Sequence, residues 1–288
     1  MDAVISGLVL GGLFTLVGQS IVLTFVTTRT INFASGEFLA VAAFIGLGLG
    51  SWTWLPGPGK IVIAVLAVGV LGALTYRFLV VPFSHGEHDT RWLLSTVGLS
   101  YVLVNLLTNA YGANPQRLGF GRISEPKTLL GANINAQALL ITVLAIIVTL
   151  VLVAGSKWTS SGLLMRAVAE DAETASLMGV SPRRVGAYAY AGASALAGLA
   201  GVLWAAEVGV SSHLGLPILV SAFAVAVIGG LTSFWGPLVG GAIYAVVVQI
   251  ASYEIGSLWG SIIGLLLVIG VLVVRPEGLL GRRMEAKL

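Results

Sequence analysis

Residues 155–185 read GSKWTSSGLLMRAVAEDAETASLMGVSPRRV, a polar segment placed between two long apolar runs. The segment holds four of the fifteen Lys and Arg residues and three of the twelve Asp and Glu residues, although only 9% of the chain is charged. An apolar chain with so polar a segment in its middle is expected to use that segment to meet something in water.

The residues of this segment predict two short helices. Ser160 or Ser161 is placed to cap a first helix, and Asp171 a second one. Gly179 is placed to end the second helix in the left-handed conformation, with Val180 as the apolar contact that follows. The segment therefore reads as helix, turn, short helix and sharp stop.

The pair Ser181-Pro182 then provides the cap and the first position of the next helix. Residues alone leave two interpretations of segment 155–185 about equally favoured. One is an ordinary cytoplasmic loop with two surface helices, and the other is a docking loop for a partner.

The composition is that of a membrane protein. Hydrophobic residues make up 57% of the 288-residue chain, and its mean hydropathy is +0.99. A net charge of +3 does not indicate a nucleic-acid partner, and without cysteine the chain has no disulfide framework or thiolate metal site. The first apolar run follows Asp2 and lacks a basic region, so we expect a retained span and no signal peptide. The 38 glycines favour closely packed transmembrane helices, with Gly7 and Gly11 placed to seat a neighbour.

A membrane span needs about 20 apolar residues, and the chain offers eight or nine such runs. The fold class we predict is therefore all-α, a polytopic transmembrane helix bundle forming one domain over residues 1–288. The expected spans are roughly Val4–Val26, Phe38–Trp54, Ile61–Val81, Trp92–Tyr111, Gln137–Ala154, Val185–Val208, Leu216–Ile228, Pro237–Ser252 and Leu258–Val274. The seventh run is short for a crossing and favours a broken or re-entrant element. The number of spans therefore stays at eight or nine.

Lys and Arg residues predict the orientation of the bundle. With segment 155–185 and the basic C-terminal tail in the cytoplasm, most Lys and Arg residues between spans also fall inside. Nine crossings then place the N-terminus outside, and eight would change its side. The C-terminus and segment 155–185 are accordingly expected in the cytoplasm.

Residues 29–37, which we call the N-terminal break, interrupt the apolar sequence after the first span and contain Asn32, Ser35 and Glu37. An interrupted helix at membrane depth offers free backbone groups and side-chain donors to a polar solute. The residues by themselves favour a simpler interpretation, a helix start with Ser35 as N-cap and Glu37 in its first turn.

A glycine-rich run at residues 229–241 resembles a second break, although close helix packing at a turn is the interpretation that its residues favour. The run contains no G-x-G-x-x-G pattern, and no Walker A motif is present in the chain. We therefore expect the chain to bind no ATP phosphates and to have no catalytic residue.

Other polar residues indicate structural roles. His85 and His88 lie in a polar loop with two neighbouring carboxylates, but this spacing favours a solvated loop and we predict no metal site. Glu207 and Glu254 fall near span ends, where hydration is expected. Three uncharged polar residues within spans, Gln19, Asn105 and Gln249, are expected to make hydrogen bonds between helices.

Three blocks of the chain resemble one known family. Residues 173–179 match an E-x-A-x-x-x-G loop, by which permeases of bacterial ABC importers meet their ATPases. Residues 166–185 with the run ALAGLAG at 195–201 closely resemble the branched-chain amino acid permease family. Residues 30–38, TINFASGEF, resemble its I-N-F-A-x-G-E-F signature, and residues 228–241 give a third match. The three blocks are in the right order and span almost the whole chain.

The resemblance implies a permease subunit of a bacterial ABC importer in the inner membrane, which translocates a small polar solute, most typically a branched-chain or other amino acid. Residues 155–185 would be the cytoplasmic ATPase-docking loop with its coupling helix, hereafter the docking loop. Expected partners are a second homologous permease, two cytoplasmic ATPases, an extracytoplasmic solute-binding protein and membrane lipid. The chain itself would bind no cofactor, since ATP and Mg belong to the ATPases.

Two sets of site residues follow from the resemblance and from the helix pattern. We expect a translocation-pathway set of Asn32, Ser35, Gly36, Glu37, Gly229 and Gly230. We expect an ATPase-docking set of Glu173, Ala175, Leu177, Met178, Gly179 and Arg183, in which Leu177 and Met178 form an apolar knob.

The sequence leaves alternatives open for both the substrate and the energy source. Members of the same family import urea, short amides or small aromatic acids, so the solute is open. A more remote alternative is an ion-coupled secondary transporter, which would carry its own coupling-ion site. No carboxylate falls in the middle of an expected span to provide one.

Overall fold

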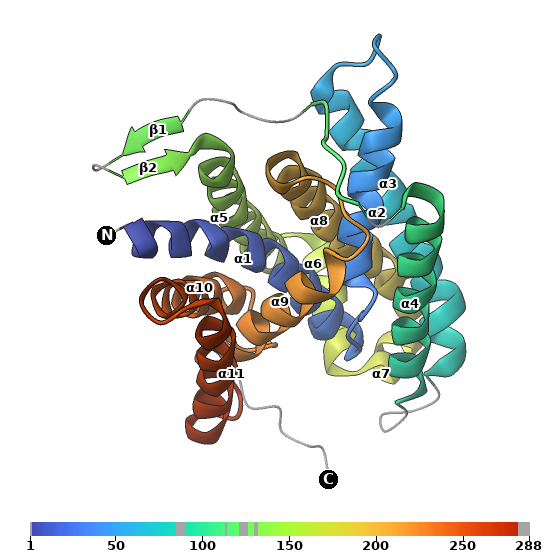
Figure 1. Cartoon of the computed structure of the whole chain (residues 1–288). Coiled ribbons are helices and arrows are strands. Elements are labelled where there is room, and N and C mark those ends of the chain that lie inside the picture. Colours follow the sequence, from blue (N-terminus) through green and yellow to red (C-terminus); the bar gives the residue numbers. More distant parts are fainter. Residues whose placement is uncertain (1, 85–89, 113, 121–125, 130–131, 282–288) are drawn as a thin grey trace.

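The computed structural model describes residues 2–84, 90–112, 114–120, 126–129 and 132–281 (Figure 1). Its helices are α1 (Asp2–Thr28), α2 (Ser35–Leu49), α3 (Gly57–Thr75), α4 (Arg91–Tyr111), α5 (Ala136–Trp158), α6 (Ser160–Glu170), α7 (Ala172–Leu177), α8 (Pro182–Val208), α9 (Gly215–Gly229), α10 (Gly236–Glu254) and α11 (Ser257–Val274). Two short strands, β1 (Pro126–Leu129) and β2 (Ala132–Asn135), form an antiparallel hairpin. The predicted all-α membrane bundle is confirmed, and the hairpin is an addition within the connection before α5.

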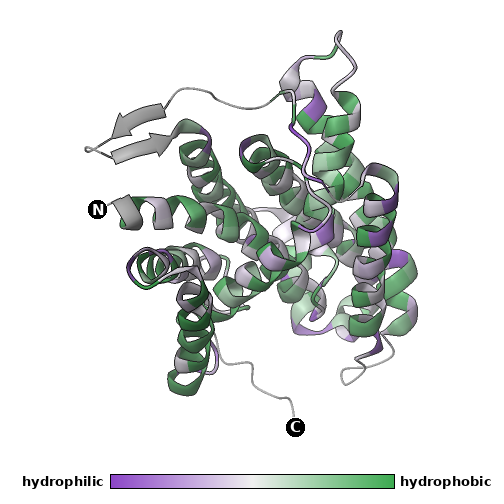
Figure 2. Cartoon of the chain, in the orientation of Figure 1, coloured by the Kyte–Doolittle hydropathy of each residue, from purple (hydrophilic) through white to green (hydrophobic). Residues whose placement is uncertain are grey.

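Seven of the helices are long and apolar enough to cross a membrane, and α2 and α9 are shorter apolar helices (Figure 2). Together they correspond to the nine expected spans. Each of the two short helices has 15 residues, which is roughly 22 Å of helix and less than the ~30 Å hydrocarbon core of a bilayer. The sequence also indicates that the runs at Phe38–Trp54 and Leu216–Ile228 are short, and the structure confirms this for both, as α2 and α9.

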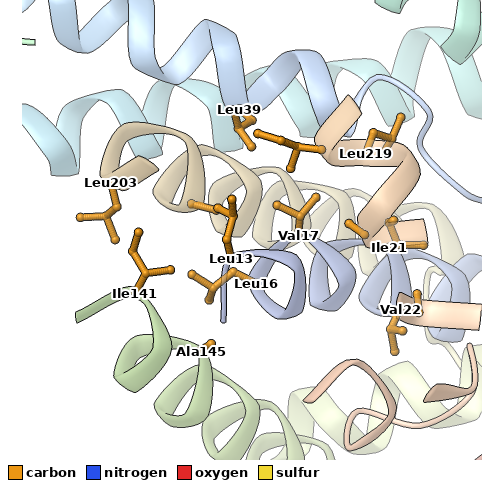
Figure 3. Close-up of a cluster of buried hydrophobic side chains, with 14 residues drawn as sticks. Leu13, Leu16, Val17, Ile21, Val22, Leu39, Ile141, Ala145, Leu203 and Leu219 are labelled. Carbon is orange, nitrogen blue, oxygen red and sulfur yellow. The ribbon is translucent and has the colours of Figure 1, made fainter. Parts of the chain in front are cut away.

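Helix α1 lies at the centre of the bundle and packs against α10, α8, α5 and α9 (Figure 1). It holds Leu13, Val17 and Ile21 in a fully buried cluster with Leu39 of α2 and Leu219 of α9 (Figure 3). Because the first helix is surrounded by helices from the rest of the sequence, most of the packing is between segments far apart in the chain.

Glycines allow the backbones to come into contact. A Cβ atom added at Gly7 would lie 2.7 Å from Val246 Cα of α10, and one at Gly11 would lie 2.8 Å from the carbonyl oxygen of Gly241. The prediction that Gly7 and Gly11 seat a neighbouring helix is therefore confirmed. Gly201 plays the same part between α8 and α2, where an added Cβ would overlap the Leu39 carbonyl.

The third span is not a uniform α-helix. After Thr75 it continues as a π-helical turn, Tyr76–Val80, and a single 3₁₀ turn, Val81–Phe83. A π-helical turn carries an extra residue and so turns the side chains that follow it. Tyr76, the first residue of the π-helical turn, packs against Tyr190 of α8, with ring centroids 4.9 Å apart.

Candidate functional site

The first helix of the docking loop, α6, is capped by Thr159. Its Oγ1 accepts a hydrogen bond from Gly162 N at 3.1 Å and donates one to the Gly155 carbonyl at 2.6 Å. The prediction of Ser160 or Ser161 as the cap is wrong by one or two positions. Thr159 has the extended backbone that a cap needs, whereas Ser160 and Ser161 already belong to the helix.

The second helix of the docking loop, α7, has both ends satisfied by local residues. Asp171 Oδ1 accepts from Glu173 N and Thr174 N at 3.1 and 2.9 Å, as predicted for the cap. Gly179 has a φ of +86° and follows the last turn, and Val180 N donates to the Ala175 carbonyl at 3.0 Å. The helix therefore ends in a Schellman motif, which confirms the predicted stop at Gly179.

A small apolar cluster fastens the docking loop together. Val168 of α6, Ala175 of α7 and Val185 of α8 are buried against one another, with Val180 packed on them. Ala175 was expected in the docking set, but it lies inside this cluster and supports the loop without facing outward. A residue on the inner face of a one-and-a-half-turn helix cannot also be on its outer face.

The rest of the docking set lies on the outer side of α7, at its C-terminal end and, for Arg183, at the start of α8. Leu177 and Met178 are 84% and 80% exposed, and Glu173, Gly179 and Arg183 are exposed as well. Two large apolar side chains at the tip of a polar loop are unusual unless a partner covers them. The loop therefore presents the apolar knob that the sequence predicts.

The N-terminal break begins at Arg29, which ends α1 with a positive φ of 57°. Asn32 Oδ1 then accepts a hydrogen bond from Ala34 N at 3.1 Å, and α2 starts at Ser35. The interpretation of Ser35 as an N-cap is wrong, since Ala34 takes that position and no side chain caps the helix. Asn32 makes the local turn in its place.

Three polar atoms of the break are buried without a hydrogen-bond partner among the described residues. They are Asn32 Nδ2, Ser35 Oγ and Glu37 Oε2, and Glu37 as a whole is 1% exposed. Buried polar groups normally have partners, so a cluster of three requires an explanation such as solute, water or a second arrangement of the helices. None of the three side chains lines an open surface in this arrangement.

The first turns of α2 and α9 meet at this cluster. A Cβ atom added at Gly36 would lie 2.5 Å from the Gly215 carbonyl oxygen, and one at Gly215 would lie 2.6 Å from Glu37 Cδ. The two short helices therefore start side by side and run from a common point. The positive dipole ends of both helices converge there, as in interrupted transporter helices.

The glycine-rich run lies at the other end of α9. Gly229 packs directly on Gly236, and Gly230 has a φ of +105°. The C-terminal segment closes this end, because Leu279 N and Leu280 N donate to the carbonyls of Ile228 and Gly229 at 2.8 and 2.9 Å. Close packing at a turn is thus what the structure shows for Gly229 and Gly230, and their role in the pathway stays a prediction.

Sequence reasoning missed two contacts that join the break to the docking loop. Thr30 Oγ1 lies 2.6 Å from Tyr190 Oη of α8, and the Arg29 guanidinium donates to the Ala169 carbonyl of α6 at 3.2 Å. The sequence signals were weak: threonines at and just after the end of the first span, and two tyrosines, Tyr188 and Tyr190, in a helix rich in small residues.

The predictions for polar residues within the spans and at their ends are confirmed in some cases and wrong in one. Gln19 Nε2 donates to Thr149 Oγ1 and to the Phe234 carbonyl, which confirms a bond between helices. For Asn105 the prediction is wrong, because its amide donates within its own helix to the Tyr101 carbonyl. Glu254 is exposed, as expected.

The sequence predicts that Glu207 is hydrated near a span end and that His85 and His88 form no metal site. Glu207 is half-buried. His85 and His88 lie outside the described residues. Within the described ranges, no group of three or more His, Asp and Glu side chains is arranged to hold a metal ion.

Comparison with known proteins gives matches along nearly the whole chain. The model of a family described as the permease component of branched-chain amino acid transport systems matches residues 3–272. The high-affinity branched-chain amino acid transport permease LivH of Salmonella typhimurium is 27% identical over 298 residues, covering 98% of this chain and 96% of the relative. LivH of Escherichia coli K12 is 26% identical and BraD of Pseudomonas aeruginosa 25%, each with the same coverage.

Among solved structures, the chain resembles PsaBC from Streptococcus pneumoniae in complex with Fab. The TM-score is 0.50 with 14% identity, and the match covers 96% of this chain and 91% of the other. At this identity the likeness shows a shared fold and nothing finer.

Proposed function

The chain belongs to the family of permease components of branched-chain amino acid transport systems, and on this premise we propose that it forms part of the membrane pathway of an ATP-driven importer of branched-chain amino acids. Relatives named for branched-chain amino acid transport support this substrate class. The observation that carries the proposal is the docking loop, a self-supported pair of helices that presents Leu177 and Met178 to a partner.

The partners of the proposed importer are those that membership of this family implies. Two cytoplasmic ATPases bind ATP and Mg and supply the energy, a second homologous permease completes the pathway, and a solute-binding protein delivers the amino acid. The chain itself contributes no catalytic residue. Membrane lipid is expected against the exposed apolar faces of outer helices such as α4 and α11, where Leu94 and Leu258 are largely exposed.

The proposed pathway runs along the two short helices. Among the described residues, Asn32, Ser35 and Glu37 each hold a polar atom without a hydrogen-bond partner where α2 and α9 begin, and separation of these helices would offer those atoms to a passing solute. We expect Asn32→Leu to lower transport while leaving assembly intact. Unchanged transport by a reconstituted Asn32→Leu complex would mean that the break is only a helix start.

The proposed sidedness places the docking loop and C-terminus in the cytoplasm of a bacterial cell. Because the chain has no cysteine, single cysteines report on it without background. We expect Ser161→Cys in the docking loop to react only from the cytoplasm and Ser51→Cys, between α2 and α3, only from outside; both side chains are exposed. The reverse pattern would overturn the orientation.

Transport in proteoliposomes tests the proposal as a whole. The permease pair is reconstituted with its ATPases and supplied with the solute-binding protein, ATP and labelled leucine. We expect ATP-dependent uptake of leucine and no uptake driven by an ion gradient alone. Uptake of urea, a short amide or an aromatic acid in preference to leucine would change the proposed substrate to another one that this family transports. Uptake driven by an ion gradient in the chain alone would contradict the proposal of an ATP-driven importer.

A further inference from the structure

One buried hydrogen bond joins the N-terminal break to the helix that leaves the docking loop. Thr30 Oγ1 and Tyr190 Oη are 2.6 Å apart, both side chains are buried, and Thr28 Oγ1 lies 2.7 Å from Thr30 Oγ1. A short hydrogen bond in an apolar surrounding is stronger than the same bond in water. Thr30 is therefore held firmly to α8.

Tyr190 is in turn fixed to the exit of the docking loop. Its ring packs on Tyr76, and Tyr76 lies over Gly186, where an added Cβ would overlap the Tyr76 ring. Gly186 follows the last residue of the docking loop and is separated from Tyr190 by about one helical turn. The first turns of α8, with both tyrosines, thus form one packed unit.

A second bond joins the break to the other flank of the docking loop. The guanidinium of Arg29 donates to the carbonyl of Ala169 at 3.2 Å, in the last turn of α6, and also lies 5.9 Å from the centre of the Phe25 ring. Cations are favoured at helix C-termini, where carbonyls lack partners. Consecutive residues of the break are therefore bonded to the helix before α7 and to the helix after it.

The far end of the break bears on α9. Gly36 and Glu37 pack directly on Gly215, the first residue of that helix. A displacement of the docking loop would therefore reach the start of α9 through a chain of only eight or so residues, which has no regular secondary structure over most of its length.

We propose that the Tyr190–Thr30 and Arg29–Ala169 bonds transmit movement of the docking loop to the point where α2 and α9 meet. Arg29, Thr30 and Tyr190 are positioning residues that touch neither ATP nor solute. The inference rests on the proposed function, since it names the physical link between ATPase movement and the transport pathway. One bond joins the break to α6, before α7, and the other joins it to α8, after α7. A shift of either helix therefore pulls on the break, and the break follows the loop as a unit.

A double-mutant cycle in the reconstituted importer tests this link. Tyr190→Phe removes one hydroxyl and Thr30→Val removes the other while nearly preserving shape. The measured quantity is the ATP hydrolysed per leucine transported. We expect each single variant to raise this ratio at least about fivefold, with ATPases fully retained, and the double variant to be no worse than either single one.

Tyr188→Phe is the matched control, because Tyr188 lies on the same helix but is exposed and has no hydrogen bond among the described residues. It should leave the ratio at the wild-type value. Arg29→Asn keeps a residue that tolerates positive φ but loses the guanidinium, and it should raise the ratio independently of the Tyr190–Thr30 pair.

Each outcome decides between the two proposals. Additive effects of Tyr190→Phe and Thr30→Val, or an equal effect of Tyr188→Phe, would overturn the link and leave the proposed function standing. A wild-type ratio of ATP hydrolysed to leucine transported in all the variants would also overturn the link and leave the proposed function standing. A wild-type chain that retains no ATPase would overturn the proposed function and this link with it.

Discussion

The docking loop and the N-terminal break are both polar interruptions of an apolar chain, yet they are built in opposite ways. In the docking loop, caps at Thr159 and Asp171 and the stop at Gly179 satisfy the helix ends locally. In the break, Asn32 makes one local bond, and neighbouring polar atoms are buried without a partner in the part of the chain that the structure describes. The loop is complete in itself, whereas the break depends on the helices around it.

This difference separates the consequences of mutation. We expect a change on the outer face of the docking loop to alter the proposed ATPase docking but to leave the membrane bundle intact, since the cluster of Val168, Ala175 and Val185 lies beneath. A substitution that adds bulk where the break meets Gly215 forces α2 and α9 apart and so disturbs the bundle itself, whereas one that nearly preserves shape leaves the bundle assembled.

The largest effect is expected for Leu177→Asp at the tip of the docking loop. A buried anchor of an interface contributes about 2 kcal/mol or more, and the substitution would also bury a carboxylate without a partner. We expect affinity for the ATPases to fall at least about 30-fold, with an unchanged melting temperature of the permease. Co-purification and thermal unfolding in detergent measure the two quantities.

Ser176→Asp is the control for Leu177→Asp, because it adds the same charge at the neighbouring exposed position without removing an apolar anchor. It should weaken ATPase binding much less. Full retention of the ATPases by Leu177→Asp would show that they dock elsewhere.

The next effect is expected inside the bundle, for Gly215→Ala. The added Cβ would lie 2.6 Å from Glu37 Cδ, so that α2 and α9 must move apart. Overpacking of this kind typically costs about 1–3 kcal/mol, and we expect a lower melting temperature together with lost transport. Thermal unfolding of the purified permease measures it.

Gly98→Ala on α4 provides the matched control for Gly215→Ala, because nothing lies within 4 Å of the added Cβ. It should leave the melting temperature unchanged or slightly raised. Equal melting temperatures of Gly215→Ala and the wild type would contradict the close contact of the two short helices.

A smaller effect is expected for Gly179→Val at the stop of α7. Its φ of +86° is strained by roughly 1 kcal/mol or more in a branched residue, although the surrounding space is open. The knob would shift, and we expect ATPase affinity to fall about fivefold with normal folding. Gly179→Asn, which tolerates this conformation, should bind nearly as the wild type; equal weakening by both variants would point to a lost contact in place of strain.

The smallest effect is expected for Thr159→Ala at the start of α6. Loss of an N-cap typically costs about 1 kcal/mol of helix stability, and here the remaining loop contacts stay. We expect faster hydrogen exchange of the α6 amides with little change in transport. Thr159→Ser keeps the hydroxyl and should exchange like the wild type, whereas no change in Thr159→Ala would argue against a capping role.

The same contrast explains what the sequence could predict. Asp171, Gly179 and Pro182 act on residues within one helical turn, so their roles follow from local rules, and the error at Thr159 is one of position only. The number of apolar helices likewise follows from the number of separate apolar runs along the sequence. A local signal is enough wherever the structure is determined by adjacent residues.

Long-range contacts decided the features that sequence reasoning missed. Ser35 reads as a good N-cap, but its first turn packs on Gly215 and its hydroxyl is buried in that contact. The partner of Thr30 is a tyrosine far along the chain, and no pattern in either neighbourhood indicates the pairing. Close approach between helices at Gly36 and Gly215 depends on a bundle already formed.

The C-terminal closure of α9 has a consequence for the order in which the protein is made. The amides of Leu279 and Leu280 satisfy the carbonyls of Ile228 and Gly229, so α9 lacks these partners until α10, α11 and the following turn have left the ribosome. Since chains emerge at about 5–20 residues per second, the synthesis of α10, α11 and the following turn takes seconds. During that time the C-terminal end of α9 lacks these two hydrogen-bond donors. We infer that α9 settles among the other helices late, after α10 and α11 have been inserted.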